Sequence, residues 1–455
     1  MKNKLHTDRQ TLNELEIINS DDRKSTVFSL LNKTVTTGGK DKLRKIFLEQ
    51  EYSIETIKKR QEAVKYILSN RKSLKFQFGK KLMDQLEYYY FLNIDPVISK
   101  YEFVNFFEGV RYWILFNSYY KTFREGVNHL FKFFGILNSL HFRNRTGDMP
   151  ELLKEIFNEI EKVLKIDFVR EILEKGDKGK PGFIEVFSTD RCFRKDYKDE
   201  MALLIDKIYE LDVLISMAKA TEEYNLTFPE FMERDKAHVE IAGLRHLFVN
   251  DCKPNDFKMT DGNYFMFLTG PNMAGKTTYL KAAGVAVFLA HLGFGVPALK
   301  MTLTTFNNLY SSINTTDNLD RGYSYFYSEV LRVKEAAMLL GKYNRSFMIF
   351  DELFRGTNVK DAFDGSLLVI KGLLNWQSSI FLLSSHLLEL AKEVSKLKGV
   401  QFNYFDSDIK DGKPLFNFEL KQGISDERLG LLILKNEKID ELLIPEKDTY
   451  NKLML

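Results

Sequence analysis

Residues 270–278 read Gly270-Pro271-Asn272-Met273-Ala274-Gly275-Lys276-Thr277-Thr278, and they fit the phosphate-binding pattern G-x-x-x-x-G-K-[ST] at every position. A short apolar run over 264–269 precedes them and predicts a buried strand, and a helical pattern over 279–289 follows. This order suits phosphate binding, because glycines let backbone N–H groups turn inward and the helix N-terminus adds the positive end of its dipole. The stretch predicts a nucleoside triphosphate site, with Lys276 on the β- and γ-phosphates and the Thr277 hydroxyl on Mg²⁺.

Two carboxylates follow a later apolar run. Phe347–Phe350 predicts a strand, and Asp351 and Glu352 come directly after it. Buried charge is costly, so paired acids at the tip of a buried strand call for a counter-charge. A Mg²⁺ ion held by Asp351 would supply it, and Glu352 would polarise the attacking water. Alone, such a run fits a surface strand end equally well, but downstream of a phosphate loop it indicates the second part of the site.

A third apolar run, over 381–383, ends in the polar cluster Ser384-Ser385-His386. This histidine is a candidate for sensing the γ-phosphate or for positioning the water. A histidine on the surface or at a helix cap is the alternative, and the two elements upstream favour the functional interpretation.

The segment 317–326 is rich in turn-forming residues and precedes a helix predicted over 328–342. The Ser324 hydroxyl and the backbone amides around it could receive a phosphate that is bound by another subunit. A solvated loop explains the composition equally well, so the segment alone decides nothing.

The composition sets the broad class. The chain has 455 residues, of which 44% are hydrophobic and 28% charged, and its net charge is +3. This length predicts two or three domains, and the mild charge neither requires nor excludes a polyanionic partner. Cys192 and Cys252 are the two cysteines and form no C-x-x-C pair, so neither a disulfide framework nor a zinc site is expected. The N-terminus lacks a secretory signal and the longest apolar stretch, 110–120, is too short to span a bilayer, which predicts a cytoplasmic protein without a membrane partner.

Two domains are predicted, with a boundary near residue 230. Residues 1–229 are helical in pattern almost throughout, apart from a loop over 175–182 and a short strand predicted over 183–187. Residues 230–455 alternate strands with helices, which is typical of an α/β nucleotide-binding domain. The predicted segments are strands at 303–310, 347–350 and 380–383, helices at 328–342 and 362–374, and a hairpin that pairs 400–405 with 415–420.

Taken together, these residues resemble the MutS family of DNA mismatch-repair ATPases. Residues 269–278 are similar to that family's T-G-P-N-M-G-G-K-S-T, with Ala274 and Thr277 as departures. Residues 351–358 resemble its D-E-[IL]-G-R-G-T-S, with Phe354 in place of a glycine. Further matches to the family's patterns are Gly322, Ser324, Phe326, Glu329 and His386, and in the helical part the segments 8–61 and 210–214.

The resemblance implies an all-α lever or core domain followed by a P-loop (Walker A) ATPase domain of the ABC type. It implies ATP and Mg²⁺ as ligands and a homodimer with two composite sites, in which Ser324 reaches the γ-phosphate bound by the opposite subunit. Phe248, after the Arg245-His246 pair, stands where the family stacks an aromatic ring on the adenine, although Leu247 replaces the family's proline. The implied partners are mismatched or branched DNA and other repair proteins.

The sequence is compatible with three classes of substrate. Family members that read mismatches carry further domains ahead of this core, and we expect none here because the helical core begins near residue 8. The alternative is a DNA-junction or chromosome-structure binding module that uses ATP as a switch, and a third interpretation is an ATPase that does not touch nucleic acid. Lys132, Arg143 and Arg145 could line a DNA groove, but their segment fits a buried aromatic core better.

Overall fold

The computed structural model describes residues 3–19, 25–96, 101–144, 148–176, 180–260, 262–313, 325–410, 413–425, 434 and 436–443. The chain forms two compact units. The α/β unit comprises Met1–Val27, Gln50–Ile54 and Tyr224–Leu455, and the helical unit comprises Phe28–Glu49 and Glu55–Glu223. Within the described ranges, no helix has both the length and the apolar character needed to span a bilayer.

The two units do not follow a single cut at residue 230. The boundary at Glu223 lies close to it, but the first 27 residues belong to the α/β unit. They are tied there by α1 (Arg9–Glu14), whose Thr11 Oγ1 accepts a 2.9 Å hydrogen bond from the Ser311 backbone N–H. Strand β1 (Asn3–Lys4) pairs with β2 (Glu51–Tyr52), which brings a second short segment into the same unit.

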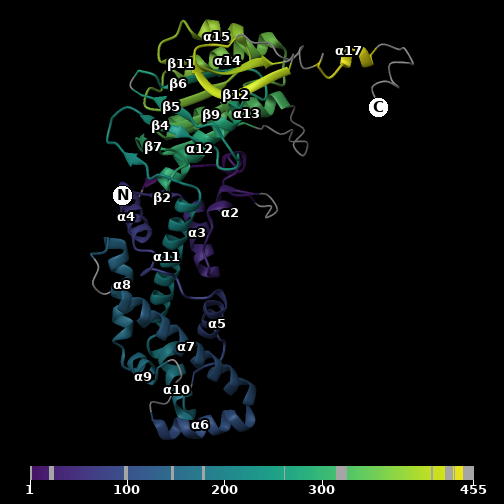
Figure 1. Ribbon diagram of the computed structural model, residues 1–455. Helices are drawn as coiled ribbons and strands as arrows, with labels where there is room; N and C mark the ends of the chain where they lie inside the picture. Colours follow the sequence, from purple (N-terminus) through teal and green to yellow (C-terminus); the bar gives the residue numbers. More distant parts are fainter. Residues whose placement is uncertain are drawn as a thin grey trace. The chain divides into compact units, whose positions relative to one another are not determined.

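A six-stranded sheet forms the centre of the α/β unit (Figure 1), in the order β12-β11-β6-β10-β9-β8. Its strands are β6 (Phe265–Thr269), β8 (Asn308–Ser312), β9 (Ser346–Asp351), β10 (Ile380–Ser384), β11 (Val400–Lys410) and β12 (Lys413–Gln422). All neighbours pair in parallel except β11 and β12, which form the predicted hairpin. Every residue of β6, β9 and β10 is buried, as expected for parallel strands that are covered on both faces.

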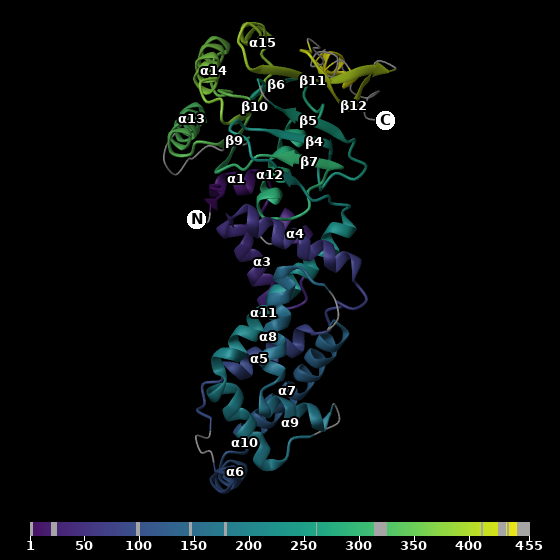
Figure 2. The same cartoon turned by 90° about the vertical axis from the view of Figure 1, so that its left-hand side faces the viewer.

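The two faces of this sheet have different covers. Side chains at alternate positions, such as Phe267, Met348 and Phe381, pack with the helices α13, α14 and α15. These helices span Tyr325–Lys342, Val359–Leu373 and Leu388–Val394. The opposite face is covered by α12 (Lys276–His291) and by a four-stranded sheet of order β3-β7-β4-β5 (Figure 2). The strands of this second sheet are β3 (Glu230–Phe231), β4 (Val239–Leu244), β5 (Asn255–Met259) and β7 (Lys300–Leu303).

The strand predicted over 303–310 is wrong as a single element. Strand β7 ends at Leu303 in the four-stranded sheet, and β8 begins at Asn308 in the six-stranded sheet. Between them, the backbone N–H of Phe306 donates to His291 Nε2 at 2.8 Å, and the phenylalanine side chain is fully buried. Phe306 is as apolar as a buried strand residue, although it lies in the connection between the two sheets. The apolar pattern therefore predicted one strand where there are two.

The helical unit is organised around α11 (Lys198–Glu223), which is buried over most of its surface and packs mainly against α3 and α8. The remaining helices of the chain's first half are α2 (Val27–Leu31), α3 (Thr37–Glu49), α4 (Ile54–Ser69), α5 (Lys80–Tyr90), α6 (Glu102–Leu115), α7 (Asn117–Arg143), α8 (Glu151–Leu164), α9 (Asp167–Lys175), α10 (Phe183–Arg191) and the π-helical turn Cys192–Asp196. Helix α7 buries Phe123, Phe131, Phe133 and Phe134. This confirms a buried aromatic core for that segment, and Arg145 lies outside the described residues.

The short strand predicted over 183–187 is wrong, because these residues open helix α10. The Glu185 carboxylate accepts a 2.9 Å hydrogen bond from the Gly182 backbone N–H, which caps the helix start. Val186, Phe187 and Asp190 are buried, with a spacing that places them on one helix face. Four apolar residues around a single glutamate cannot distinguish a strand from a buried helical turn.

Candidate functional site

Three adjacent parallel strands deliver the candidate residues to one edge of the six-stranded sheet. Strand β6 leads into the glycine loop 270–275, β9 ends at Asp351, and β10, which lies between them, ends at Ser384. The backbone N–H of Glu352 donates to Ser384 O at 3.1 Å, and that of Ser385 donates to Leu268 O at 3.0 Å. Ligands of open α/β sheets bind outside the carboxyl ends of the strands, so this edge is where a site is expected.

The glycine loop requires its glycines. Gly270 and Gly275 have φ angles of 133° and 103°, a region that other residues rarely adopt. A Cβ at Gly270 would lie 2.9 Å from Phe405 O, so the backbone of β11 leaves no room for a side chain there. Gly275 is the N-cap of α12, and the positive end of that helix therefore faces the loop.

Lys276 places a buried ammonium group inside the loop. Its Nζ donates to Gly270 O at 2.7 Å and to Pro271 O at 3.0 Å, and the residue is 6% exposed. Burial lowers the pKa of Lys276, although the nearby Glu352 and Asp351 charges oppose this shift. An anion bound in the loop would stabilise the charged ammonium, so the position suits a phosphate group.

Thr277 and Asp351 meet across the strand ends. The Thr277 hydroxyl donates to Asp351 Oδ2 at 2.6 Å, and the Ser384 hydroxyl donates to Asp351 Oδ1. Among the described residues, no group of three or more His, Cys, Asp and Glu side chains could hold a metal ion. A hydroxyl and one carboxylate nevertheless fit Mg²⁺, which binds through one or two carboxylates together with substrate phosphates.

Glu352 is held by an arginine and a histidine. Arg355 Nε lies 2.9 Å from Oε2, and His386 Nδ1 lies 3.4 Å from Oε1. Burial alone would raise the pKa of Glu352, but the His386 hydrogen bond and the Arg355 charge outweigh it and lower the pKa. The same hydrogen bond raises the pKa of His386. Glu352 is therefore an ionised carboxylate at neutral pH, which is the protonation state of a general base.

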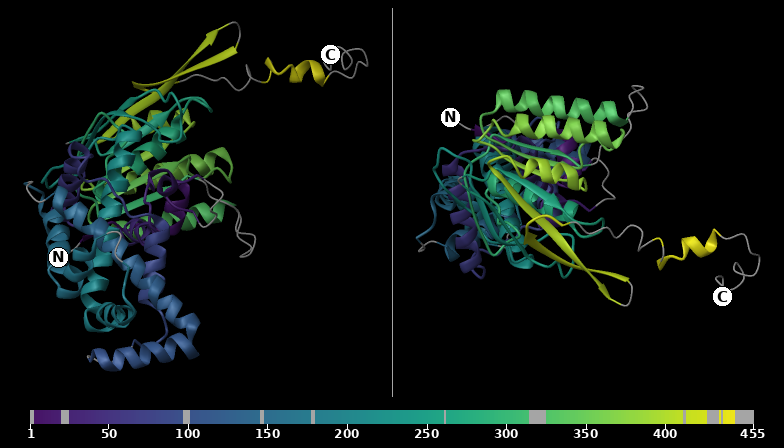
Figure 3. Two further views of the ribbon diagram at one scale, coloured as in Figure 1. Left: turned by 60° about the horizontal axis from the view of Figure 1, so that its bottom comes forward. Right: turned by 90° about the horizontal axis from the view of Figure 1, so that it is seen from above.

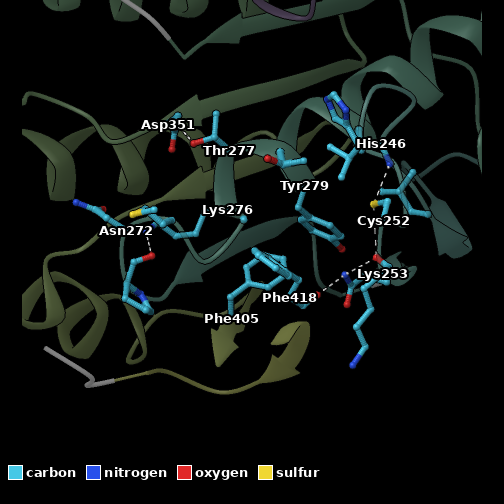
Figure 4. A pocket seen from close by; sticks show the side chains of 18 of the residues that line it. His246, Cys252, Lys253, Asn272, Lys276, Thr277, Tyr279, Asp351, Phe405 and Phe418 are labelled. Carbon is cyan, nitrogen blue, oxygen red and sulfur yellow. Dashed lines mark hydrogen bonds between the residues drawn. The ribbon is translucent and has the colours of Figure 1, made fainter. Parts of the chain in front are cut away.

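A cavity of about 590 Å³ lies beside the glycine loop (Figure 4). Its walls are the loop and the start of α12, the strand ends at Asp351 and Glu352, the segment 249–255, and Phe405 and Phe418 of the hairpin. The hairpin extends past the other strands of the sheet (Figure 3). Asn255 Nδ2 donates to Phe418 O at 2.9 Å, and this bond ties the hairpin to the cavity wall.

Two family models match this chain. The model described as MutS domain III matches residues 10–218, and the model described as MutS domain V matches residues 266–453. The chain belongs to the MutS family. The match to domain III lies in the helical part and the match to domain V in the α/β part, and residues 219–265 lie between them.

The relatives of this MutS-family chain are longer. The DNA mismatch repair protein MutS of Bacillus pumilus is 30% identical over 271 residues, which is 58% of this chain and 31% of the relative. The corresponding protein of Bacillus licheniformis is 30% identical over 274 residues, or 59% of this chain and 31% of the relative. That of Listeria monocytogenes is 26% identical over 339 residues, which is 71% of this chain and 38% of the relative. The chain spans about a third of the length of these curated relatives.

Most of the site residues predicted from the sequence meet at the cavity of this MutS-family chain. Those that line it are Pro271, Asn272, Met273, Gly275, Lys276, Thr277, Thr278, Asp351 and Glu352. Gly270, Ala274 and His386 are not among the lining residues. The two loop residues are next in sequence to residues that line the cavity, and His386 contacts Glu352, which lines it. Ser324 lies outside the described residues.

Phe248, the residue predicted to stack on the adenine, is not among the lining residues. Its backbone N–H donates to His246 Nδ1 at 3.3 Å, and its ring centroid lies 5.8 Å from that of His246. His246 itself lines the cavity, and Phe418 lines it as well. The stacking role of Phe248 stays a prediction, and the rings that line the cavity are those of His246, Tyr279, Phe405 and Phe418.

Sequence reasoning assigned no role to Arg355, Ser384 or Phe418. Arg355 follows Glu352 by three residues, and besides its ion pair with Glu352 it donates from Nη2 to Asp351 O at 2.9 Å. The sequence could have indicated a role for Arg355, because it lies within four residues of both Asp351 and Glu352. Phe418 carries no such signal, because nothing in its hairpin's pattern indicates that the hairpin folds against the glycine loop.

Glu329 of α13 fixes the turn that follows Glu352. Its carboxylate accepts hydrogen bonds of 3.3 Å from the backbone N–H groups of Arg355 and Gly356. One turn further along α13, Arg332 Nη1 lies 2.6 Å from Asp8 Oδ2 in the N-terminal segment. The same helix therefore contacts both the turn that follows Glu352 and the first residues of the chain.

The structure accommodates Phe354, which stands where the MutS pattern has a glycine. Its φ angle is 60°, in the left-handed region that glycine adopts most easily. The Phe354 side chain is buried, and a Cβ at Gly365 would come within 3.0 Å of its ring. The glycine at 365 thus leaves the space that the phenylalanine occupies.

Proposed function

We propose that this MutS-family chain binds ATP with Mg²⁺ in the 590 Å³ cavity and hydrolyses it as part of a DNA-associated activity. The observation that carries the proposal is the convergence on one cavity of a glycine loop with a buried lysine, a hydroxyl–carboxylate pair, and an ionised glutamate beside a histidine. These are the parts that P-loop nucleotide hydrolases use to position phosphates and activate water.

Each part has a distinct role in this proposal. The loop amides and Lys276 bind the β- and γ-phosphates, and Glu352 accepts a proton from the attacking water while His386 holds the carboxylate in place. Thr277 and Asp351 would hold Mg²⁺, which neutralises charge on the phosphates. By the family resemblance, Ser324 of one protomer completes the site of the other in a homodimer.

Loss of the buried ammonium group tests the nucleotide site most directly. A charge-assisted hydrogen bond contributes roughly 1.5–3 kcal/mol, so Lys276→Ala is expected to weaken ATP binding by about 10- to 100-fold. Lys258→Ala is the matched control, because Lys258 lies on the same unit with a side chain that is 62% exposed and paired with Glu240. Equal ATP affinity of both variants in a titration would reject the site.

Mixing two inactive variants tests the composite dimer site. A dimer of one Lys276→Ala chain and one Ser324→Ala chain contains one doubly altered site and one intact site. Mixing should therefore restore ATP turnover above that of either variant alone. If the turnover of the mixture is the average of the two parents, each site is made by one chain and the homodimer proposal fails.

We further propose DNA, mismatched or branched, as the partner, supported by relatives that are named DNA mismatch repair protein MutS. A DNA-junction or chromosome-structure module with ATP as its switch is the alternative. Homoduplex, mismatched and junction DNA are titrated with and without ATP at fixed salt, since salt dominates such affinities. Preference for a mismatch favours repair, and preference for junctions favours the alternative. No DNA binding, and no effect of DNA on ATP turnover, would reject both.

A further inference from the structure

Helix α6 exposes an unusual amount of apolar surface. It lies across one end of the helical unit, next to the start of α7 (Figures 1 and 3). Exposed fractions between 39% and 76% are found on α6 for Phe103, Val104, Phe106, Phe107, Trp113, Ile114 and Leu115, and beside it for Tyr101, Phe116 and Tyr119. At about 150–250 Å² for each aromatic side chain, this exposed area is on the order of 1,000 Å². Monomeric proteins rarely expose more than a few hundred Å² in one apolar patch.

One face of α6 is already occupied. Gly109 is buried against α10, where a Cβ would come within 2.7 Å of the Phe183 ring and 2.8 Å of the Phe187 ring. The Tyr112 ring centroid lies 5.9 Å from that of Phe187 on the same side. This face seats the helix on its own unit, so the remaining apolar residues are not needed to hold α6 in place.

The opposite face carries a regular stripe. Phe103, Phe107, Val110 and Ile114 follow one another at intervals of four, three and four residues. This spacing places them in one row along a helix, and it is the spacing by which two helices pair along an apolar seam. Phe103, Phe107 and Ile114 are 73%, 56% and 63% exposed. We call these four residues the α6 stripe.

The charge on α6 identifies the kind of occupant. Its sequence holds two acidic residues, Glu102 and Glu108, and one basic residue, Arg111, so its formal charge is −1. Arg111 lies 3.3 Å from Glu108 and is neutralised within the helix. DNA binding and membrane-surface binding both rely on several lysines or arginines, which α6 lacks. A near-neutral apolar seam instead suits a copy of itself, because a two-fold contact uses the same patch on both partners.

We propose that the α6 stripe pairs with the α6 stripe of a second copy of this chain, forming a two-helix contact that does not require nucleotide. The exposed area is sufficient, since a standard interface buries about 800 Å² on each partner. This contact is separate from the composite ATP sites proposed above and does not depend on them.

The test measures the mass of the full chain in solution without nucleotide. Wild type at micromolar concentration should have twice the 53.2 kDa mass of the monomer, and Phe107→Glu with Ile114→Glu should return it to the monomer value. Phe142→Glu is the matched control, because Phe142 is 74% exposed on α7 but lies outside the stripe. Circular dichroism confirms that the variants are folded. A monomeric wild type, or a doubly substituted chain that keeps the wild-type mass, overturns the proposal.

Repeating the measurement with Lys276→Ala distinguishes the two proposed contacts. If the α6 contact exists, the Lys276→Ala chain is a dimer without nucleotide, and adding the two glutamate substitutions halves its mass. If the chains meet only through ATP sites, both samples are monomers. The failure of one proposal therefore leaves the other intact.

Cross-linking locates the contact on the helix. In a Cys192→Ser, Cys252→Ser background, Phe107→Cys should give a cross-linked dimer with a short bis-maleimide, and Phe142→Cys should not. Co-sedimentation with phosphatidylserine vesicles and binding to duplex DNA complete the test. If the two glutamate substitutions abolish either of these bindings and leave the mass unchanged, the stripe binds a membrane or DNA and the self-pairing proposal is wrong.

Discussion

Each unit of this protein withdraws a carboxylate from solvent, Asp212 fully and Glu352 in part, and the two carboxylates have different partners. In the helical unit, Asp212 is 1% exposed and accepts hydrogen bonds from the backbone N–H groups of Val35 and Thr36 at 2.8–3.1 Å. In the α/β unit, Glu352 contacts Arg355 and His386 at the edge of a cavity. Burial raises the pKa of Asp212 despite its hydrogen bonds, whereas His386 and Arg355 lower the pKa of Glu352 against the effect of burial.

The difference teaches that burial alone does not identify a functional carboxylate. The partners of Asp212 are the backbone N–H groups of Val35 and Thr36 and the Thr36 hydroxyl, so this aspartate fixes the position of α11 relative to the start of α3. The partners of Glu352 are Arg355 in the strand-end turn and His386 after the end of β10, and both lower the pKa of this carboxylate beside the cavity. The first arrangement serves stability, and the second is suited to chemistry.

The sharpest test of this contrast is Glu352→Gln. General-base catalysis contributes about 10²- to 10⁴-fold, so ATP turnover should fall at least 100-fold. The amide keeps an oxygen that can accept from Arg355 Nε, and the free energy of unfolding should change by less than about 1 kcal/mol. Turnover and chemical denaturation are measured on the same sample. Turnover within threefold of wild type would remove Glu352 from the chemistry.

Asp212→Ala should produce the opposite result. It leaves the Val35 and Thr36 N–H groups and the Thr36 hydroxyl without their acceptor, which we expect to cost about 3 kcal/mol of unfolding free energy. At a temperature where the variant is fully folded, ATP turnover should stay within twofold of wild type. If turnover is lost while the chain is folded, Asp212 acts on the ATP site and the contrast breaks down.

Two helix-capping glycines extend the comparison from side chains to backbone. Gly275 caps α12 with a φ angle of 103°, and Gly79 caps α5 with a φ angle of −75°. Gly275→Ala should therefore cost about 1–3 kcal/mol in the glycine loop and weaken ATP binding by roughly tenfold or more. Gly79→Ala, with nothing within 4 Å of the added Cβ and an ordinary φ angle, should cost about 0.5–1 kcal/mol, the usual loss at an exposed N-cap. Equal ATP affinities for the two variants would contradict the requirement for loop strain.

Features that arise from a short local stretch of sequence could be predicted, and contacts between residues far apart in the chain could not. The strands that carry the candidate residues were predicted because each is a local apolar run followed by polar residues, and parallel strands place such ends together. The meeting of Thr277 with Asp351 and of Glu352 with His386 follows from that topology. Their catalytic roles and the trans role of Ser324 stay predictions.

The sequence could not predict contacts between distant segments, because no motif or periodicity links one segment to the other. The N-terminal segment folds into the α/β unit through pairs such as Thr11 with Ser311 and Asp8 with Arg332, about 300 residues apart. Phe418 reaches the glycine loop through the orientation of a hairpin, which its strand pattern does not encode. Local runs also misled at 183–187, where a capped helix start has the composition of a strand.

The smallest predicted effect is on the pH dependence of ATP turnover. It distinguishes a partner that titrates from a partner that does not. Because the His386 hydrogen bond is the largest influence that lowers the pKa of Glu352, His386→Gln should let that pKa rise toward the value set by burial. The base form is then lost at a higher pH as the solution is acidified, so the acid limb of kcat/KM for ATP should move to higher pH while the plateau changes little. Thr36→Val, which removes one donor to Asp212, should leave the limb in place because no titrating partner is lost. An acid limb that is unmoved in His386→Gln would mean that Arg355 alone keeps the carboxylate ionised, and the histidine would then have a positioning role only.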